Sequence, residues 1–435
     1  KGEFMKKSKF VKSTIILIIG GFITKILGML IKIVMTRLIG TEGIGLYMMI
    51  SPTFMLLITI AQLGFPVAIS KLVAEDKGNN KNIVFSILPV SIIINIIIII
   101  FLLFFSGFLS TNLLKDPNLK TPLLCVGLVL PFISISSILR SYFFGKQKML
   151  PHVVSNITED IIRLITLLLG IPIFIQKGIY SAISFIVLSN ILSEITSIIV
   201  LFIFLPKNFS LKKEDIIPNK QNIKNIFNIS IPSTGSRILG NIAYFFEPII
   251  VTNILLKIGY TNNFIVTEYG IINGYVMPLL MLPSFFTLAI SQALLPVVSN
   301  SYCNNELNYT KKKIRQAIFF SLIIGIPATI VFMIFPEFLL KTIYNTSEGI
   351  TYIRVLAPIF ILHYIQSPLT SSLQAMNKAK CAMMGTLIGI IIKTGALIIF
   401  LNLRIGLWGL IIATSLGTIY ITLHHIYYTK KYLKN

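Results

Sequence analysis

Long apolar runs with almost no charged residue follow one another along this chain. The clearest extends from Ile92 to Phe105 and contains a single polar residue, Asn95. A helix that crosses a bilayer needs about 20 residues of this kind, because inside lipid the backbone polar groups must bond to one another. Twelve runs of the 435-residue chain are long enough. The sequence therefore predicts an all-α polytopic membrane protein.

The composition excludes the soluble alternatives. Only 12% of the residues are charged and 55% are hydrophobic, with a mean hydropathy of +0.85, whereas soluble domains are about 25% charged. So few charges cannot cover a soluble surface of this size, which rules out soluble enzymes and disordered or fibrous chains. The expected transmembrane helices occupy residues 13–36, 44–70, 83–109, 121–142, 152–175, 180–204, 224–256, 266–299, 314–336, 351–376, 381–402 and 405–428.

The basic residues indicate how the chain is oriented. There are 38 Lys and Arg against 15 Asp and Glu, which gives a net charge of +23. With twelve spans, 24 basic residues fall in loops on the side of the termini and eight on the other side. Positively charged loops stay in the cytoplasm, so both termini are expected there, in a bacterial cytoplasmic membrane. This distribution explains the charge without nucleic acid, for which the sequence has no binding motif.

The sequence carries no pattern for catalysis, a cofactor or a metal. Its three cysteines and four histidines lack metal-ligand spacing, and it has no phosphate-binding loop of the nucleotide-hydrolysing kind. A membrane enzyme acting on lipid-linked sugars would need paired carboxylates or a base at the membrane surface, and none is found. We therefore expect no cofactor, no metal site and no enzymatic activity.

Short internal echoes divide the chain into two halves. Thr24–Gly28 returns as Ser236–Gly240, and two further pairs follow in the same order. Six helices in each half put both halves in the membrane in the same direction, as in transporters whose site lies between the halves near mid-membrane. The expected parts are an expression scar at 1–4, an N-terminal six-helix lobe at 5–205, a basic cytoplasmic linker at 206–223 and a C-terminal six-helix lobe at 224–435.

Charged residues inside the spans are the candidates for that site. Each costs about 2.5–3.5 kcal/mol at bilayer depth, so it should face a partner or a wet cavity. Lys25 and Lys32 are seven residues apart and share one helix face, and Arg237 takes the place of Lys25 in the second half. These cations predict a mid-membrane cavity for an anion such as phosphate or diphosphate, with Glu247 nearby. The alternatives are lysines that reach the membrane interface and a structural Arg237–Glu247 ion pair.

Four other intramembrane charges are interpreted as ion-pair or gating residues. Glu159 and Arg163 have the i,i+4 spacing of a helix ion pair, with the acid on the N-terminal side. Glu194 and Lys393 are candidates for ion-pair partners or for gating, and their spacing does not decide between these roles.

Several segments resemble one group of membrane proteins. Residues 24–28 and 36–47, the latter ending in Glu-Gly-Ile-Gly-Leu-Tyr, are similar to the first helical hairpin of the stage V sporulation protein B and polysaccharide flippase group. Residues 64–75 and 140–147 carry further matches. This group belongs to the multidrug/oligosaccharidyl-lipid/polysaccharide (MOP) exporter superfamily and is related to the lipid II flippases.

The resemblance implies two six-helix lobes that form a V-shaped central cavity. It also implies a flippase that moves an undecaprenyl-diphosphate-linked saccharide, either a lipid II-like cell-wall precursor or a polysaccharide unit, across the cytoplasmic membrane by alternating access. In lipid II flippases, basic residues of the first helix are expected to meet the diphosphate, and Lys25 and Lys32 match them here. The implied partners are this anionic substrate, membrane lipids and a coupling ion, either a proton or sodium, for a protein that acts as a monomer.

The alternative function is a cation-coupled multidrug exporter of the same superfamily. The main charged group of its cavity would be a carboxylate, so Glu247 would be essential and the lysines dispensable. The two hypotheses therefore differ in the sign of the charge that contacts the substrate.

Overall fold

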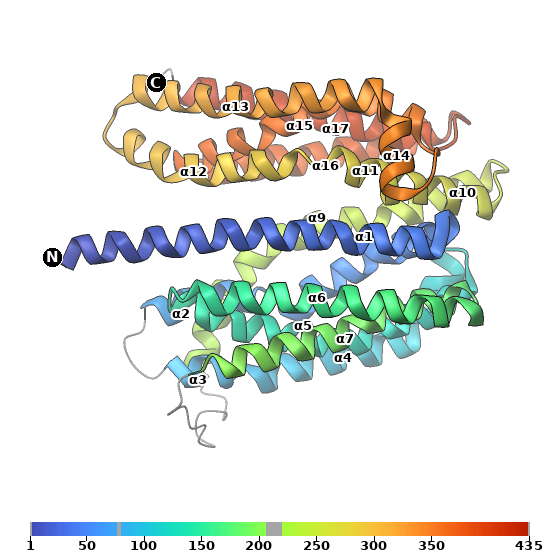
Figure 1. Ribbon diagram of the computed structural model, residues 1–435, viewed down its shortest axis with the longest axis horizontal. Coiled ribbons are helices and arrows are strands. Elements are labelled where there is room, and N and C mark those ends of the chain that lie inside the picture. The colour runs from blue at the N-terminus through green and yellow to red at the C-terminus, as the bar shows by residue number, and fades with distance from the viewer. Residues whose placement is uncertain (1, 76–79, 206–219, 434–435) are drawn as a thin grey trace. The chain divides into compact units, whose positions relative to one another are not determined.

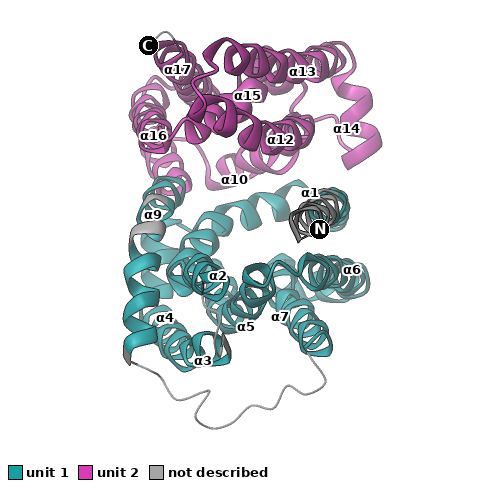
Figure 2. Cartoon of the chain, turned by 90° about the vertical axis from the view of Figure 1, so that its left-hand side faces the viewer, with its two compact units in different colours: residues 1–245 teal, residues 246–435 magenta. Residues whose placement is uncertain are grey.

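The computed structural model describes residues 2–75, 80–205 and 220–433. Within these ranges every regular element is a helix, as Figure 1 shows. The helices form two compact units, Lys1–Phe245 (unit 1) and Phe246–Asn435 (unit 2), which Figure 2 colours separately. The division falls inside α9 (Lys220–Lys257). Residues 206–219, most of the expected linker, lie outside the described part of the chain.

Unit 1 is a bundle of long helices. Its α-helices are α1 (Gly2–Gln62), α2 (Phe65–Glu75), α3 (Asn80–Phe85), α4 (Ile87–Phe108), α5 (Lys120–Gly145), α6 (Met149–Phe174), α7 (Ile179–Ile203) and the first part of α9. α5 packs against α2, α4 and α7, and α6 packs against α1 and α7. Helices α5, α6 and α7 therefore form the part of the unit where polar side chains from three elements can meet.

Helix α1 contains two membrane crossings that join at Gly40. This residue has φ 69° and ψ −175° inside the helix, a conformation that essentially only glycine adopts. Figure 1 shows the chain returning after this point, so that α2 lies at the same end of the unit as the start of α1. The two expected spans at 13–36 and 44–70 thus lie on either side of Gly40, and the second continues past the end of α1 into α2.

Unit 2 contains the last part of α9 and eight further α-helices. These are α10 (Asn262–Gly270), α11 (Met277–Leu280), α12 (Ser284–Cys303), α13 (Leu307–Ile334), α14 (Pro336–Tyr344), α15 (Ile350–Ala375), α16 (Ala379–Leu401) and α17 (Trp408–Tyr432). α15 packs against α12, α13 and α17, and α16 packs against α17. Unit 2 therefore has α15 at its centre.

The described helices have the length and composition of membrane spans. Nine segments qualify, or ten if Asn262–Leu280 and Ser284–Cys303, which meet at 50°, count as one broken span. One of the nine, Ile19–Glu75, covers both of the first two expected spans. Helix α6 is 26 residues long but carries three charged residues, Glu159, Asp160 and Arg163. It is therefore not among the nine candidate spans, which must be strongly apolar. The prediction of an all-α polytopic membrane protein is confirmed; the V-shaped cavity stays a prediction.

Helix α4 shows how these helices expose apolar side chains and bury polar ones. Ile93, Ile97 and Phe104 are 57%, 59% and 79% exposed, while Asn95 is fully buried and its amide donates hydrogen bonds to Ser91 O at 2.7 Å and Ser134 Oγ at 3.1 Å. In lipid, a buried amide without such acceptors is costly. The exposed side chains therefore form the face that contacts acyl chains.

The conformation of Gly40 gives a prediction about stability. Changing Gly40 to Ala should lower the free energy of unfolding by about 1–3 kcal/mol, because a Cβ strains this backbone conformation. A Cβ at Gly40 meets no atom within 4 Å, so the loss would come from the backbone alone. The measurement is thermal or denaturant unfolding of the purified protein in detergent.

Gly107 provides the matched control. It lies in α4, and a Cβ there also meets no atom within 4 Å. Because its backbone is helical, Gly107→Ala should leave stability unchanged or raise it slightly. Equal stability of the two alanine variants would contradict the role assigned to Gly40.

Candidate functional site

A cavity of about 850 Å³ lies within unit 1. Side chains from α1, α2, α5, α6 and α9 line it, and its basic lining residues are Lys71, Arg140, His152 and Arg237. Further lining residues bear hydroxyl or amide groups (Gln62, Ser70, Ser137, Ser141 and Gln147) or are apolar (Leu17, Pro66, Val67, Phe144 and Met149). The cavity therefore combines fixed positive charge, hydrogen-bond donors and an apolar wall.

The cavity lies near one end of the candidate membrane span Pro117–Gly145. Gly145, Gln147 and Met149, around the turn between α5 and α6, are among its lining residues. Arg140 precedes the last residue of α5 by five positions, about 8 Å along a helix. A bound anion would therefore lie near the level of lipid headgroups, where a charged group costs less than at mid-membrane.

Glycine allows α5 and α2 to approach each other closely beside this cavity. A Cβ at Gly145 would lie 2.7 Å from the Ser70 carbonyl oxygen and 2.8 Å from Val73 Cβ. Neither a backbone carbonyl nor a Cβ can move aside without the helix that carries it. Gly145 therefore sets the distance between the two helices that carry Arg140 and Lys71.

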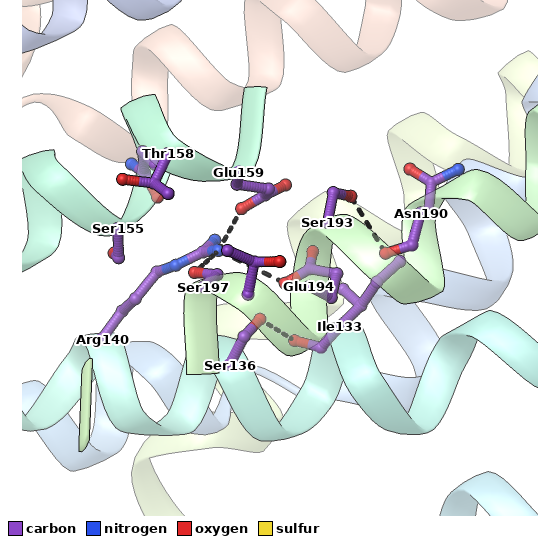
Figure 3. A network of polar contacts seen from close by, with 12 residues as sticks. Ile133, Ser136, Arg140, Ser155, Thr158, Glu159, Asn190, Ser193, Glu194 and Ser197 are labelled. Carbon is purple, nitrogen blue, oxygen red and sulfur yellow. Dashed lines mark hydrogen bonds and ion pairs between the residues drawn. The ribbon is translucent and has the colours of Figure 1, made fainter. Parts of the chain in front are cut away.

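The guanidinium of Arg140 lies at the centre of a polar network, shown in Figure 3. Its Nη2 forms an ion pair with Glu159 Oε2, lies 3.3 Å from Glu194 Oε2 and donates a hydrogen bond to Ser197 Oγ at 2.7 Å. The side chains of Arg140, Glu159 and Glu194 are 18%, 14% and 7% exposed. The network joins three helices, because Arg140 is on α5, Glu159 on α6 and Glu194 on α7.

This network corrects the ion pair expected within α6. Glu159 pairs with Arg140, 19 residues away in sequence, and forms no ion pair with Arg163. The physical reason is that an i,i+4 pair on one helix contributes only about 0.2–0.5 kcal/mol, whereas a carboxylate between packed helices needs a counter-charge that reaches it. Arg140 is one of the 24 basic residues assigned above to loops on the side of the termini, although it lies within the expected span at 121–142.

A second buried carboxylate lies in unit 2. Glu247 is 7% exposed, and its Oε2 lies 2.6 Å from the Lys393 ammonium. The Tyr269 hydroxyl donates to the other oxygen, Oε1, at 3.2 Å. Both carboxylate oxygens therefore have partners in unit 2. The counter-charge of Glu247 is Lys393 on α16, and not Arg237, which the sequence analysis had considered as its ion-pair partner.

The three cations expected to act together have different surroundings. Arg237 lines the unit 1 cavity, whereas Lys25 and Lys32 are not among its lining residues. Lys25 is exposed and Lys32 is half-buried. Both lysines lie on the same stripe of the α1 surface as Gly21 and Gly28. A Cβ added at either glycine would meet nothing within 4 Å.

The opposite side of α1 is closely packed. A Cβ at Gly20 would lie 2.2 Å from Val153 Cγ1 of α6, so Gly20 marks the face by which α1 contacts its neighbour. The stripe with Lys25 and Lys32 is rotated by more than about 100° from that face. Both lysines are therefore turned away from the contact with α6.

Comparison with known proteins places this architecture in a family. A family model for polysaccharide biosynthesis proteins matches residues 10–302, and one for MatE proteins matches residues 248–396. Stage V sporulation protein B of Bacillus subtilis (strain 168) is 38% identical over 433 residues, which are 97% of this chain and 83% of that protein. The chain belongs to the polysaccharide biosynthesis protein family of the MOP superfamily. Within it, the chain falls in the group of stage V sporulation protein B.

More distant members of the MOP superfamily share the full extent of the chain. The lipid II flippase MurJ of Bacillus subtilis (strain 168) is 25% identical over 447 residues, covering 95% of this chain and 81% of that protein. A solved multidrug resistance MATE family transporter of the MOP superfamily, in its inward-facing conformation, has a TM-score of 0.72 at 17% identity, with 94% of each chain covered. These likenesses support a multi-span membrane transporter of the flippase group.

The Arg140 network gives a prediction about stability. Changing Arg140 to Gln should lower the free energy of unfolding by about 3–5 kcal/mol, because two buried carboxylates lose their counter-charge. The triple variant R140Q/E159Q/E194Q removes all three charges together and should recover most of that loss. Thermal unfolding in detergent measures both. Equal losses in the single and the triple variant would contradict a network held together by charge.

Proposed function

We propose that this protein is an alternating-access transporter that flips an undecaprenyl-diphosphate-linked saccharide from the cytoplasmic to the outer leaflet. The observation that carries the proposal is the unit 1 cavity, with Lys71, Arg140, His152 and Arg237 among its lining residues. Chains in the same superfamily flip lipid II, as the name of MurJ states. A cavity that is partly cationic and partly apolar suits a substrate with a diphosphate and a prenyl chain.

The chemistry of the cavity matches the parts of such a substrate. Guanidinium groups bind phosphate oxygens through paired, charge-assisted hydrogen bonds, and Arg140 and Arg237 supply two of them. Hydroxyl groups of Ser137 and Ser141 can bond to phosphate or sugar oxygens. The apolar lining residues suit the first part of a prenyl chain. A volume of about 850 Å³ is in the range that holds a ligand headgroup.

Lys25 and Lys32 are proposed as a further station for the diphosphate. They share one stripe of α1 with Gly21 and Gly28, where no side-chain atom lies close to the backbone. An anion can approach such a stripe closely, and each ammonium supplies three donors. Arg237, which corresponds to Lys25 in the internal repeat, would then lie on the same route.

The proposed orientation rests on the distribution of basic residues, and the proposed driving force is the membrane potential or an ion gradient. With both termini in the cytoplasm, the Lys146–Lys148 turn beside the cavity is cytoplasmic, which is where an undecaprenyl-linked precursor would enter. The membrane potential contributes about 2.3 kcal/mol per elementary charge for each 100 mV, and a proton or sodium ion is the proposed coupling ion. The transporter is proposed to act as a monomer.

A cation-coupled multidrug exporter is the second candidate, and the MatE match at residues 248–396 and the MATE fold favour it. That function would need a carboxylate open to cations, with Glu247 in that role. Glu247 is engaged on both oxygens by Lys393 and Tyr269, which leaves it little capacity for a cationic drug. The flippase function therefore has more support.

The flippase proposal predicts that removing one cavity cation slows translocation. Arg237→Gln should reduce the rate in proteoliposomes by about tenfold to a hundredfold, because a charge-assisted hydrogen bond is worth about 1.5–3 kcal/mol. Lys25→Gln/Lys32→Gln should have an effect of similar size. The measurement follows a fluorescent prenyl-diphosphate-linked sugar that becomes accessible to an added quencher or hydrolase.

Lys341 supplies the control, because it is exposed on α14 and pairs there with Glu337. Lys341→Gln should flip the substrate at the wild-type rate. Normal flipping by both cavity variants would contradict the proposal. Drug efflux that is lost in Glu247→Gln and kept in the cavity variants would support the multidrug exporter instead.

A further inference from the structure

We propose that Arg140 binds a phosphate of the substrate, and that Glu159 and Glu194 occupy the same guanidinium when the substrate is absent. The two carboxylates would then act as an internal anion that the substrate displaces. This inference rests on the proposed function, and it identifies the residue that links anion binding to the packing of α5, α6 and α7.

The first observation is that Arg140 belongs to both the cavity and the network. It is a lining residue of the cavity, whereas Glu159 and Glu194 are not, and its Nη2 contacts both carboxylates. Figure 3 shows the guanidinium directed toward Glu159 and Glu194 from its own helix. A ligand in the cavity and the two carboxylates therefore compete for one group.

The second observation is that the guanidinium is not fully used. Its contacts with Glu159, Glu194 and Ser197 are all made by Nη2, although a guanidinium has five N–H donors. The buried Nε of Arg140 has no hydrogen-bond partner among the described residues. A phosphate that binds in a paired mode of arginine uses Nη2 together with either Nε or Nη1, so in both modes it would have to take Nη2 from the carboxylates.

The third observation is the balance of charge. One guanidinium serves two carboxylates, so the three groups carry a net negative charge in their ionised forms. On the same helix as Glu159 lie Asp160 and Arg163, which have opposite charges, and His152. Lys71 and Arg237 attract a phosphate to the cavity, whereas Glu159 and Glu194 oppose its contact with Arg140. Removing one carboxylate charge should make anion binding stronger, and by more than removing a nearby charge that does not contact Arg140.

Displacement would also loosen the bundle. Arg140 is on α5, while Glu159 and Glu194 are on α6 and α7, so a phosphate that takes Arg140 breaks an ionic link between α5 and both neighbours. The binding of the substrate would then favour rearrangement of these three helices. In this way an occupied site differs from an empty one in helix packing as well as in charge.

The test measures binding of farnesyl diphosphate, a short prenyl diphosphate, to the purified full-length protein by titration calorimetry. Glu159→Gln and Glu194→Gln should each tighten binding by about threefold to tenfold, which corresponds to about 0.7–1.4 kcal/mol. The triple variant R140Q/E159Q/E194Q should bind about tenfold more weakly than E159Q/E194Q. The comparison between these two multiple variants keeps the carboxylates absent, so no buried carboxylate is left without its counter-charge.

Asp160→Asn is the matched control. It removes the same charge one residue from Glu159, and Asp160 forms no ion pair with Arg140. It should change the affinity by less than about twofold. Thermal unfolding of every variant verifies that the fold is kept.

The outcomes separate this inference from the proposed function. If the wild-type protein binds farnesyl diphosphate and the glutamine variants bind it equally or more weakly, the displacement of Glu159 and Glu194 is wrong and the flippase proposal stands. Equal tightening by Asp160→Asn would likewise overturn it, because general repulsion would then explain the effect. If neither the wild-type protein nor E159Q/E194Q binds the diphosphate, both proposals fail.

Discussion

Charge is expensive inside a bilayer, at about 2.5–3.5 kcal/mol for each side chain at the centre of a helix. Most of the polar organisation of this protein follows from that cost. Glu194 and Glu247, whose side chains are both 7% exposed, each have a basic partner on another helix. The same requirement determines which helices stay together, because each ion pair holds the elements that supply its two members.

The two units meet this requirement differently. In unit 2, one ammonium and one phenol hydroxyl serve a single carboxylate, that of Glu247. In unit 1, one guanidinium serves two carboxylates and also belongs to the wall of a cavity. The first arrangement is complete in itself, whereas the second includes a guanidinium that lines a space that a ligand can fill and whose Nε has no partner among the described residues. This difference is the reason for assigning the anion site to unit 1.

The sequence predicted the helices well, because each needs a local run of apolar residues. It did not predict which charges pair. Arg140 meets Glu159 and Glu194 across 19 and 54 residues, and Glu247 meets Lys393 across 146. Partners so distant depend on how helices pack, and spacing along one helix, as for Glu159 and Arg163, carries no information about that. A reversal between the spans at 13–36 and 44–70 was expected, but Gly40 was not singled out as its position, since a single glycine has many possible roles.

For the cavity, the sequence predicted Lys25, Lys32 and Arg237, and of these the structure places Arg237 in the cavity lining. Arg237 was identified through the internal repeat and lines the cavity. Arg140 was missed because it lies five residues from the end of α5, where a basic residue is ordinarily a loop residue that marks the cytoplasmic side. Arg140 follows the apolar residues Ile138 and Leu139, which are buried in the structure, and precedes the small residue Ser141. These apolar and small neighbours were the available signal that this end of the helix is enclosed.

The most direct measurement is an experimental structure of the full-length protein in lipid with a bound prenyl diphosphate. We predict phosphate oxygens within about 3 Å of the guanidinium groups of Arg140 and Arg237, with Glu159 and Glu194 no longer in contact with Arg140. A diphosphate bound away from both arginines, with Arg140 still paired to the two carboxylates, would contradict this prediction.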